Sequence, residues 1–253
     1  MTGYREENKL IMDKNAPIGV FDSGVGGLTV AREIMRQIPK ERIIYFGDTA
    51  RVPYGSKSKE TIIRYGSKSK DNIIKFSRQI IRFLQTENVK AIVIACNTAS
   101  ALALDEMQQE FDLPILGVVK PGAKVAVETT ANKRIGLIGT EANIRSGVYT
   151  RYIKSLDDEA KVFEKACPLF VPLVEEGWLH DDITLQVASR YLEELKEKDI
   201  DTLIMGCTHY PLIRSTIRKV MGDKVNLVNP AYETAIELKN LLERDNLANK
   251  CDV

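Results

Sequence analysis

The sequence lacks a long hydrophobic run and an excess of either charge. Among its 253 residues, 36 lysines and arginines nearly balance 35 aspartates and glutamates, which leaves a net charge of +1. This balance gives no electrostatic basis for binding nucleic acid or a membrane surface. No apolar run approaches the roughly 18–20 residues of a membrane-spanning helix, and the charged first 15 residues lack the apolar core of a secretion signal. We therefore expect a cytoplasmic protein without a nucleic-acid or membrane partner.

Cysteine and histidine are both scarce. The four cysteines are Cys96, Cys167, Cys207 and Cys251. Their wide spacing, without any C-x-x-C pair, argues against a disulfide framework and against a zinc site. The only histidines are His180 and His209, so a metal site would need an unusual number of carboxylates. We expect no metal and no cofactor. A free cysteine is usually a small buried hydrophobe, and this interpretation suffices for Cys167 and Cys251.

Short apolar runs alternate with longer helical patterns along the chain. The expected strands are residues 18–21, 43–46, 91–94, 115–118, 135–138, 202–205 and 225–228. Each is a nearly continuous apolar run, which is typical of parallel strands buried on both faces. The expected helices are residues 28–38, 59–85 (interrupted), 100–111, 121–130, 183–198 and 212–220. This alternation predicts an α/β fold with right-handed crossovers.

The two halves of the chain resemble each other. KAIVIACNTASALALDEMQ, from Lys90, aligns with DTLIMGCTHYPLIRSTIRK, from Asp201. In both segments an apolar strand is followed by a small residue, a cysteine, a nearby threonine and a helix. We therefore predict two α/β domains related by an approximate twofold axis. One domain is expected to comprise residues 1–118 and 229–253, and the other residues 119–228.

A tandem duplication of 11 residues interrupts this pattern. YGSKSKETIIR is followed directly by YGSKSKDNIIK, which together cover residues 54–75. The repeat is too short to be a solenoid unit. We interpret it as a local insertion whose extra residues lie at the surface.

Four polar loops follow expected strands, at the place where open α/β sheets bind ligands. The first loop, DSGVGG from Asp22, has three glycines that permit a tight turn and a close approach of the backbone to an anion. Its spacing does not match a dinucleotide fingerprint, and it is alternatively a structural turn capped by Asp22. The second loop, GDTARVPYG, is either a substrate-positioning segment or a long connection.

The third and fourth loops carry the two remaining cysteines, in CNT from Cys96 and CTH from Cys207. A thiol at a helix N-terminus has a pKa below about 8.5, so we expect thiolate near neutral pH. His209 is able to exchange protons with Cys207 or with a substrate. The neighbouring side chains suited to binding a carboxylate are Asn97, Thr98 and Thr208.

Two thiols in equivalent positions of two similar halves indicate acid–base chemistry at both faces of one carbon. Inversion of a carbon centre removes a proton from one face and delivers another to the opposite face, which one base cannot easily do. Two alternatives remain. A cysteine hydrolase or thiol oxidoreductase would have one dispensable cysteine, or a redox pair close in sequence. A non-catalytic amino-acid-binding protein would tolerate substitution of both thiols.

Five motifs in order resemble the glutamate racemases of the aspartate/glutamate racemase superfamily: GVFDSGVGGLTV, YFGDTARVPYG, VIACNTASA, ACPLFVPLVEEG and GCTHYPL. The resemblance extends over residues 17–228. It implies two Rossmann-like domains with mostly parallel sheets and the active site in the cleft between them. It also implies cofactor-independent interconversion of L- and D-glutamate for peptidoglycan biosynthesis, by a homodimer. An aspartate racemase or a broad-specificity amino-acid racemase is the alternative.

The resemblance also assigns roles to individual residues. Cys96 and Cys207 match the two catalytic thiols, and the first is said to deprotonate D-glutamate and the second L-glutamate. Asp22 matches the carboxylate that assists Cys96, and His209 with Glu175 matches the groups that assist Cys207. Taken alone, Glu175 would equally be the end of a strand, and Asp48 lies in a motif whose acidic residue is also implicated. The matches to substrate-binding positions are Asp22, Ser23, Pro53, Tyr54, Gly55, Asn97, Thr98, Thr140, Asn143, Thr208 and His209. At Asn143 the family usually has threonine, a change that we expect to alter affinity rather than abolish activity.

Overall fold

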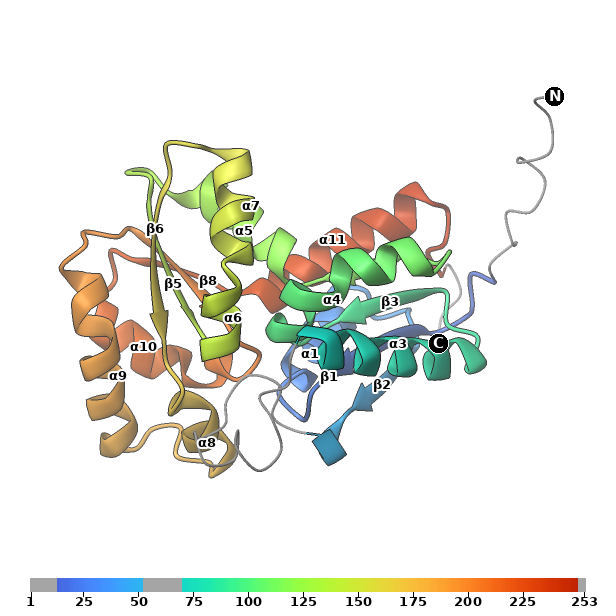
Figure 1. The fold of residues 1–253 in the computed structure, drawn as a ribbon, viewed down its shortest axis with the longest axis horizontal. Coiled ribbons are helices and arrows are strands. Elements are labelled where there is room, and N and C mark those ends of the chain that lie inside the picture. Colours follow the sequence, from blue (N-terminus) through green and yellow to red (C-terminus); the bar gives the residue numbers. More distant parts are fainter. Residues whose placement is uncertain (1–12, 52–69, 250–253) are drawn as a thin grey trace.

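The computed structural model describes residues 13–51 and 70–249. These residues form two four-stranded parallel sheets that lie side by side, each flanked by helices (Figure 1). The predicted α/β architecture with two Rossmann-like halves is therefore confirmed. No helix in residues 13–51 and 70–249 is long and apolar enough to cross a membrane.

The first sheet has the strand order β2-β1-β3-β4. Its strands are β1 (Ile18–Asp22), β2 (Ile43–Gly47), β3 (Ala91–Ile94) and β4 (Ile115–Gly117). Its helical segments are α1 (Leu28–Gln37), η1 (Thr49–Arg51), α3 (Lys70–Thr86) and α4 (Asn97–Glu110). Phe21 of β1 pairs with Ile94 of β3, so the chain leaves both strands at the same edge of the sheet. β1 and β3 are buried along their whole length because helices cover both faces.

The second sheet repeats this topology with the order β6-β5-β7-β8. Its strands are β5 (Arg134–Gly139), β6 (Lys161–Ala166), β7 (Thr202–Gly206) and β8 (Asn226–Val228). The helical segments after β4 are α5 (Val119–Thr129), α6 (Glu141–Ser146), α7 (Val148–Leu156), α8 (Phe170–Glu175), α9 (Asp182–Lys196), η2 (Tyr210–Ile213), α10 (Arg214–Met221) and α11 (Pro230–Arg244). β3 and β7 hold equivalent third positions, and each leads into one of the paired cysteines.

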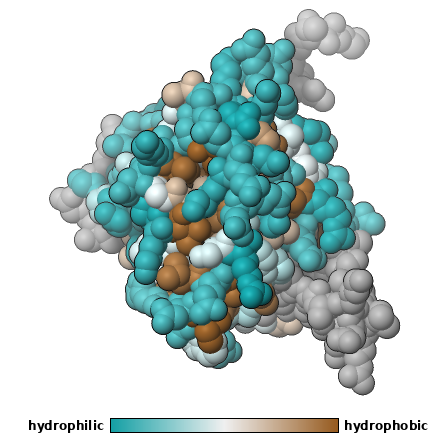
Figure 2. All heavy atoms as spheres, turned by 90° about the vertical axis from the view of Figure 1, so that its left-hand side faces the viewer, coloured by the Kyte–Doolittle hydropathy of each residue, from teal (hydrophilic) through white to brown (hydrophobic). Residues whose placement is uncertain are grey.

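The structure differs from expectation at β6, at Glu175 and in four helices that were not predicted, α6, α7, α8 and α11. β6 was not predicted because it is a half-buried edge strand, in which Lys161, Glu164 and Lys165 interrupt the apolar run. Figure 2 looks onto this side of the molecule, where hydrophobic atoms form a band between hydrophilic surfaces. Glu175 ends a helix, α8, and the alternative that it ends a strand is wrong.

The last helix returns to the first sheet. α11 packs against α1 and α5, and its Ala235 and Leu238 share a core with Val20 of β1 and Val93 of β3. The chain thus crosses between the two halves once before α5 and again before α11.

The duplicated segment is described only from residue 70 onward. There α3 begins inside the second copy, and Ile73 of that copy is fully buried in the first core. Ile73 belongs to the apolar face of α3, whereas Lys70, Asp71 and Asn72 before it are exposed. Residues 54–69 of the duplication lie outside the described residues, so their surface position stays a prediction.

Candidate active site

The loops after the two sheets meet at a single place. Thr98, just after β3, and Thr140, just after β5, are joined through their hydroxyl oxygens at 3.1 Å. Thr29 of α1 donates a hydrogen bond to the backbone oxygen of Thr208, after β7, at 2.9 Å. Both contacts connect the carboxyl edge of one sheet with that of the other. Of the predicted residues that the structure describes, Thr98, Thr140 and Thr208 lie at this junction, and His209 lies close to Gly26 of the opposite half.

The glycine-rich loop after β1 needs its glycines in order to pack this closely. A Cβ on Gly26 would lie 2.5 Å from Cε1 of His209 and 2.5 Å from Oγ1 of Thr208, on the other half of the molecule. A Cβ on Gly27 would lie 2.4 Å from Cβ of Asp22. These distances leave no room for a side chain, so the loop serves close approach to protein groups rather than to a pyrophosphate.

Asp22 is the last residue of β1 and is buried almost completely. One carboxylate oxygen accepts a hydrogen bond from the backbone N–H of Gly24 at 3.0 Å. The other is buried without a hydrogen-bond partner among the described residues. Burial raises the pKa of Asp22, while the Gly24 N–H and a positive charge on His209 act in the opposite direction. The free oxygen is positioned to exchange a proton or to accept a hydrogen bond from a ligand.

Cys96 occupies the N-cap position of α4 and is 6% exposed. Its sulfur lies 3.7 Å from the hydroxyl oxygen of Ser23. Burial, followed by the negative charge of Asp22, raises the pKa of Cys96 to about 12. The expectation that the helix N-terminus makes this thiol a thiolate near neutral pH is therefore wrong, because the loss of solvation outweighs the contribution of the backbone amides.

Cys207 follows β7 and begins a chain of three polar side chains. Its sulfur lies 3.8 Å from Nδ1 of His209, whose Nε2 lies 3.1 Å from Oε1 of Glu175 at the end of α8. Burial is the main cause that raises the pKa of Cys207, and the negative charges of Cys96 and Asp22 add to it. His209 is buried whereas the side chain of Glu175 is 47% exposed, so the chain connects the thiol with solvent. Burial thus favours the protonated form of both thiols.

We expect alkylation of Cys96 and Cys207 by iodoacetamide to be slow at pH 7 and to accelerate with pH beyond 9. The thiolate is the reacting species, so a pKa of about 12 for Cys96 leaves only a minute reactive fraction at neutral pH. Peptide mass spectrometry after timed labelling measures each site, and the same protein in denaturant gives the unperturbed rate. Rapid labelling of Cys96 that levels off below pH 8.5 would contradict a buried, protonated thiol.

Asn143 supports the strand that leads to Cys207. Its backbone N–H caps α6 by donating to Oγ1 of Thr140, and its Nδ2 donates to the carbonyl oxygen of Gly206 at 2.8 Å. Its Oδ1 is buried and accepts no hydrogen bond within the described part of the chain. That oxygen is the group with which Asn143 could accept a hydrogen bond from a bound amino acid. Its role in substrate binding stays a prediction.

The other predicted residues fall into two groups. Asp48 is buried, donates its backbone N–H to the backbone oxygen of Asp22, and places its carboxylate 3.6 Å from Arg51. These two contacts stabilise the loop that follows β2. Pro53, Tyr54 and Gly55 lie outside the described residues.

Sequence reasoning missed several residues that hold the site together. Tyr45 of β2 donates its hydroxyl to the carbonyl oxygen of Gly24 at 2.6 Å and so fixes the loop around Asp22. Thr29 forms the contact with Thr208 described above. Tyr149 of α7 donates to Oδ1 of Asn97 at 2.7 Å. Tyr45 and Thr29 stand inside two of the motifs quoted above, YFGDTARVPYG and GVFDSGVGGLTV, but no role was assigned to them. Tyr149 stands in none of these motifs, and its only signal was a polar side chain within an otherwise apolar pattern.

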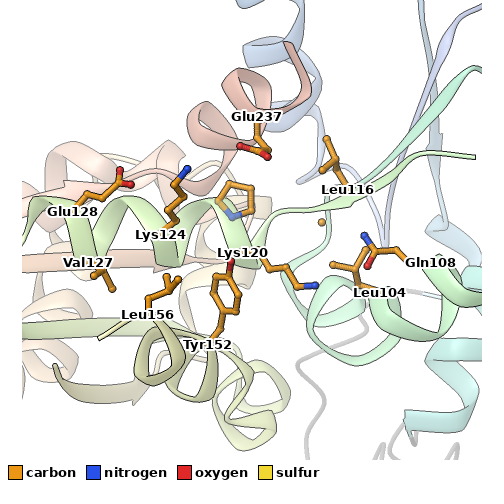
Figure 3. A pocket seen from close by; sticks show the side chains of 12 residues that line it. Leu104, Gln108, Leu116, Lys120, Lys124, Val127, Glu128, Tyr152, Leu156 and Glu237 are labelled. Atoms are coloured by element: carbon orange, nitrogen blue, oxygen red, sulfur yellow. The ribbon is translucent and has the colours of Figure 1, made fainter. Parts of the chain in front are cut away.

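The described residues contain no group of three or more histidine, cysteine and carboxylate side chains that could hold a metal ion. A separate pocket of about 560 Å³ lies where α4, α5, α7 and α11 meet (Figure 3). None of the residues predicted for the site lines it. Lys120 and Lys124 in its wall are balanced by Glu128 and Glu237, so its charge specifies no class of ligand.

Comparison with known proteins agrees with this geometry. Residues 18–236 match the family described as Asp/Glu/Hydantoin racemase. The glutamate racemase of Geobacter metallireducens is 50% identical over 86% of this chain and 77% of its own length, and that of Oceanobacillus iheyensis is 45% identical over 96% and 84%.

Solved structures lead to the same family. A glutamate racemase isoform of Bacillus anthracis has a TM-score of 0.86 at 42% identity and covers 94% of this chain and 86% of its own. The Francisella tularensis glutamate racemase, solved with D-glutamate, has a TM-score of 0.85 at 39% identity over 94% and 85%. An aspartate racemase of Picrophilus torridus shares the fold at 14% identity and a TM-score of 0.67. By the extent of the family match and the identity to its members, the chain belongs to the Asp/Glu/hydantoin racemase family.

Proposed function

We propose that this protein is a glutamate racemase that uses Cys96 and Cys207 as two opposed acid–base groups. The observation that carries the proposal is the placement of two buried thiols after the equivalent strands β3 and β7, at the junction of the two sheets. Relatives at 45–50% identity are named glutamate racemases, whereas the aspartate racemase named above shares only 14% identity. The alternative of an aspartate racemase is therefore not favoured.

The proposed reaction needs one thiolate and one thiol at a time. The thiolate removes the Cα proton from one face of the amino acid, and the opposite thiol protonates the other face, so the two sulfurs exchange protonation states in each turnover. Because burial favours the protonated form of both thiols, whichever thiol acts as the base must first lose its proton to a neighbour, while the other keeps its proton. His209, braced by Glu175, is placed to accept the proton of Cys207. Asp22 is placed to serve Cys96, and the substrate's ammonium group would stabilise either thiolate.

The substrate-binding groups are proposed from the same junction. The polar side chains at its centre are Ser23, Asn97, Thr98, Thr140 and Thr208, all within the loops that follow the strands or at the first turns of helices. Backbone N–H groups at the start of α4 add donors for a carboxylate.

Finer features are also proposed. Residues 1–118 and 229–253 would form one domain and residues 119–228 the other, which the packing of α11 on α1 supports. The chemistry requires no cofactor, since the two thiols supply both proton transfers. Resemblance to bacterial relatives supports a cytoplasmic homodimer that supplies D-glutamate for peptidoglycan.

A circular dichroism assay of L-glutamate without added cofactor tests the proposal. We expect the optical signal to decay to zero as the racemate forms, with and without prior EDTA treatment. L-aspartate should react at least about ten-fold less efficiently, because a pocket that discriminates one methylene gains roughly 10–200-fold. Activity lost with EDTA and restored by a metal, or a preference for aspartate, would overturn the assignment.

A further inference from the structure

One side-chain contact joins the two halves directly beside Cys96. Tyr149 lies in the first turn of α7, on the second half, and its hydroxyl donates to Oδ1 of Asn97, the first residue of α4 on the first half, at 2.7 Å. Tyr149 is 1% exposed. α7 contacts both α4 and α5 where the two halves meet. The contact therefore depends on the two halves being docked.

The fold holds the phenol ring rigidly. Gly147, with φ at 61°, ends α6 and lets α7 start at the next residue, which directs Tyr149 toward the junction. The ring is buried in a core with Val119, Ala123 and Leu137, so it has no room to reorient. Burial and the nearby negative charge of Cys207 raise the pKa of Tyr149 far above its usual value. The hydroxyl thus keeps its proton and remains a donor.

A donor at this place determines what Asn97 presents to the active site. A side-chain amide has an oxygen that accepts and an NH₂ group that donates. Because Tyr149 occupies Oδ1, the remaining group is Nδ2, which donates to no described residue. Asn97 is adjacent to Cys96 and is 5% exposed, so a free donor here lies close to the place where an amino acid would bind beside Cys96.

We propose that Tyr149 is a positioning residue, which orients the Asn97 amide so that its NH₂ group binds the substrate carboxylate and does so only when the two halves are docked. This inference rests on the proposed function. It adds a residue from the second half to the carboxylate site of the first half. Loss of the phenol hydroxyl frees the amide to rotate and to present its oxygen, which repels a carboxylate.

The test is a double-mutant cycle of Tyr149→Phe and Asn97→Ala, with KM and kcat measured for both enantiomers of glutamate. We expect Tyr149→Phe to raise KM about ten-fold with a smaller change in kcat. The reason is that the Asn97 amide, no longer oriented, loses its hydrogen bond to the charged carboxylate of the substrate. In the Asn97→Ala background the same change should have almost no further effect, because the two residues act as one unit. Tyr152→Phe, one turn further along α7, serves as the matched control and should leave KM unchanged. If Asn97→Ala does not fold, Asn97→Ser replaces it.

The outcomes separate the two proposals. The positioning role alone would be overturned if the wild-type enzyme is active but Tyr149→Phe leaves KM unchanged. The same holds if Tyr149→Phe raises KM by the same factor in the wild-type and in the Asn97→Ala background. A wild-type enzyme that does not racemise glutamate would remove the proposed function, and this inference with it. A merely structural role for Tyr149 would lower the melting temperature without coupling to Asn97.

Discussion

Alanine in place of Cys96 or Cys207 should reduce racemisation by at least about 10³-fold in either direction. A positioned acid or base typically contributes 10²–10⁴-fold, and each face of the substrate is served by one sulfur. The histidine and carboxylate neighbours are not expected to substitute, because His209 reaches Cys207 through its Nδ1 at 3.8 Å and holds Glu175 with its other nitrogen. Circular dichroism from pure L- and pure D-glutamate measures both directions.

Cys167 provides the matched control for this experiment. It is fully buried in the second core, where its sulfur lies 3.7 Å from the backbone oxygen of Lys165, and it lies outside the junction of the loops. Cys167→Ala should retain activity once the protein is folded. Substantial racemisation by Cys96→Ala or Cys207→Ala would remove the basis for a two-thiol mechanism.

The Lys90→Met variant is expected to be less stable by about 3–5 kcal/mol, which is the usual effect of removing one partner of a buried ion pair. Lys90 is completely buried before β3, and its ammonium lies 2.5 Å from Oε2 of Glu41 and donates to the backbone oxygen of Lys14. Glu41 in turn accepts a hydrogen bond from the backbone N–H of Asn249 at 2.8 Å. Methionine keeps much of the apolar stem but leaves the carboxylate buried without its counter-charge.

Urea denaturation followed by far-UV circular dichroism measures this loss. Lys120→Met is the control, because Lys120 is 45% exposed and its pair with Asp105 spans 3.4 Å. An exposed pair of this kind contributes about 0–1 kcal/mol. A Lys90→Met variant as stable as Lys120→Met would show that the buried pair does not tie the N-terminal and C-terminal segments to the first sheet.

The sequence was most informative where strands are buried on both faces. β1, β3, β5 and β7 are nearly continuous apolar runs, and each ends at a polar residue or loop that is recognisable in one dimension. β6 was not predicted because an edge strand needs only partial burial, and this one carries charged residues. The equivalent cysteines after β3 and β7 were predicted because their strand–cysteine–helix segments resemble each other.

The chemistry of the site was less accessible from sequence. The helix N-terminus at Cys96 is visible in the motif and argues for a low thiol pKa. The burial that reverses this effect depends on how the two sheets pack, which no local pattern encodes. The same limit applies to Tyr149, whose partner Asn97 is 52 residues away in the chain and on the other half of the molecule.

Solvent deuterium incorporation during early turnover tests the two-base account most directly. In D₂O, starting from pure L-glutamate and separately from pure D-glutamate, each first-formed product should carry deuterium at Cα while the unreacted substrate keeps its proton. This asymmetry arises because one thiolate removes the proton and a different, solvent-exchanged thiol delivers the deuteron. Chiral chromatography with mass spectrometry separates the two pools. A product that retains the original proton, or early labelling of substrate and product to the same extent, would contradict two separate bases.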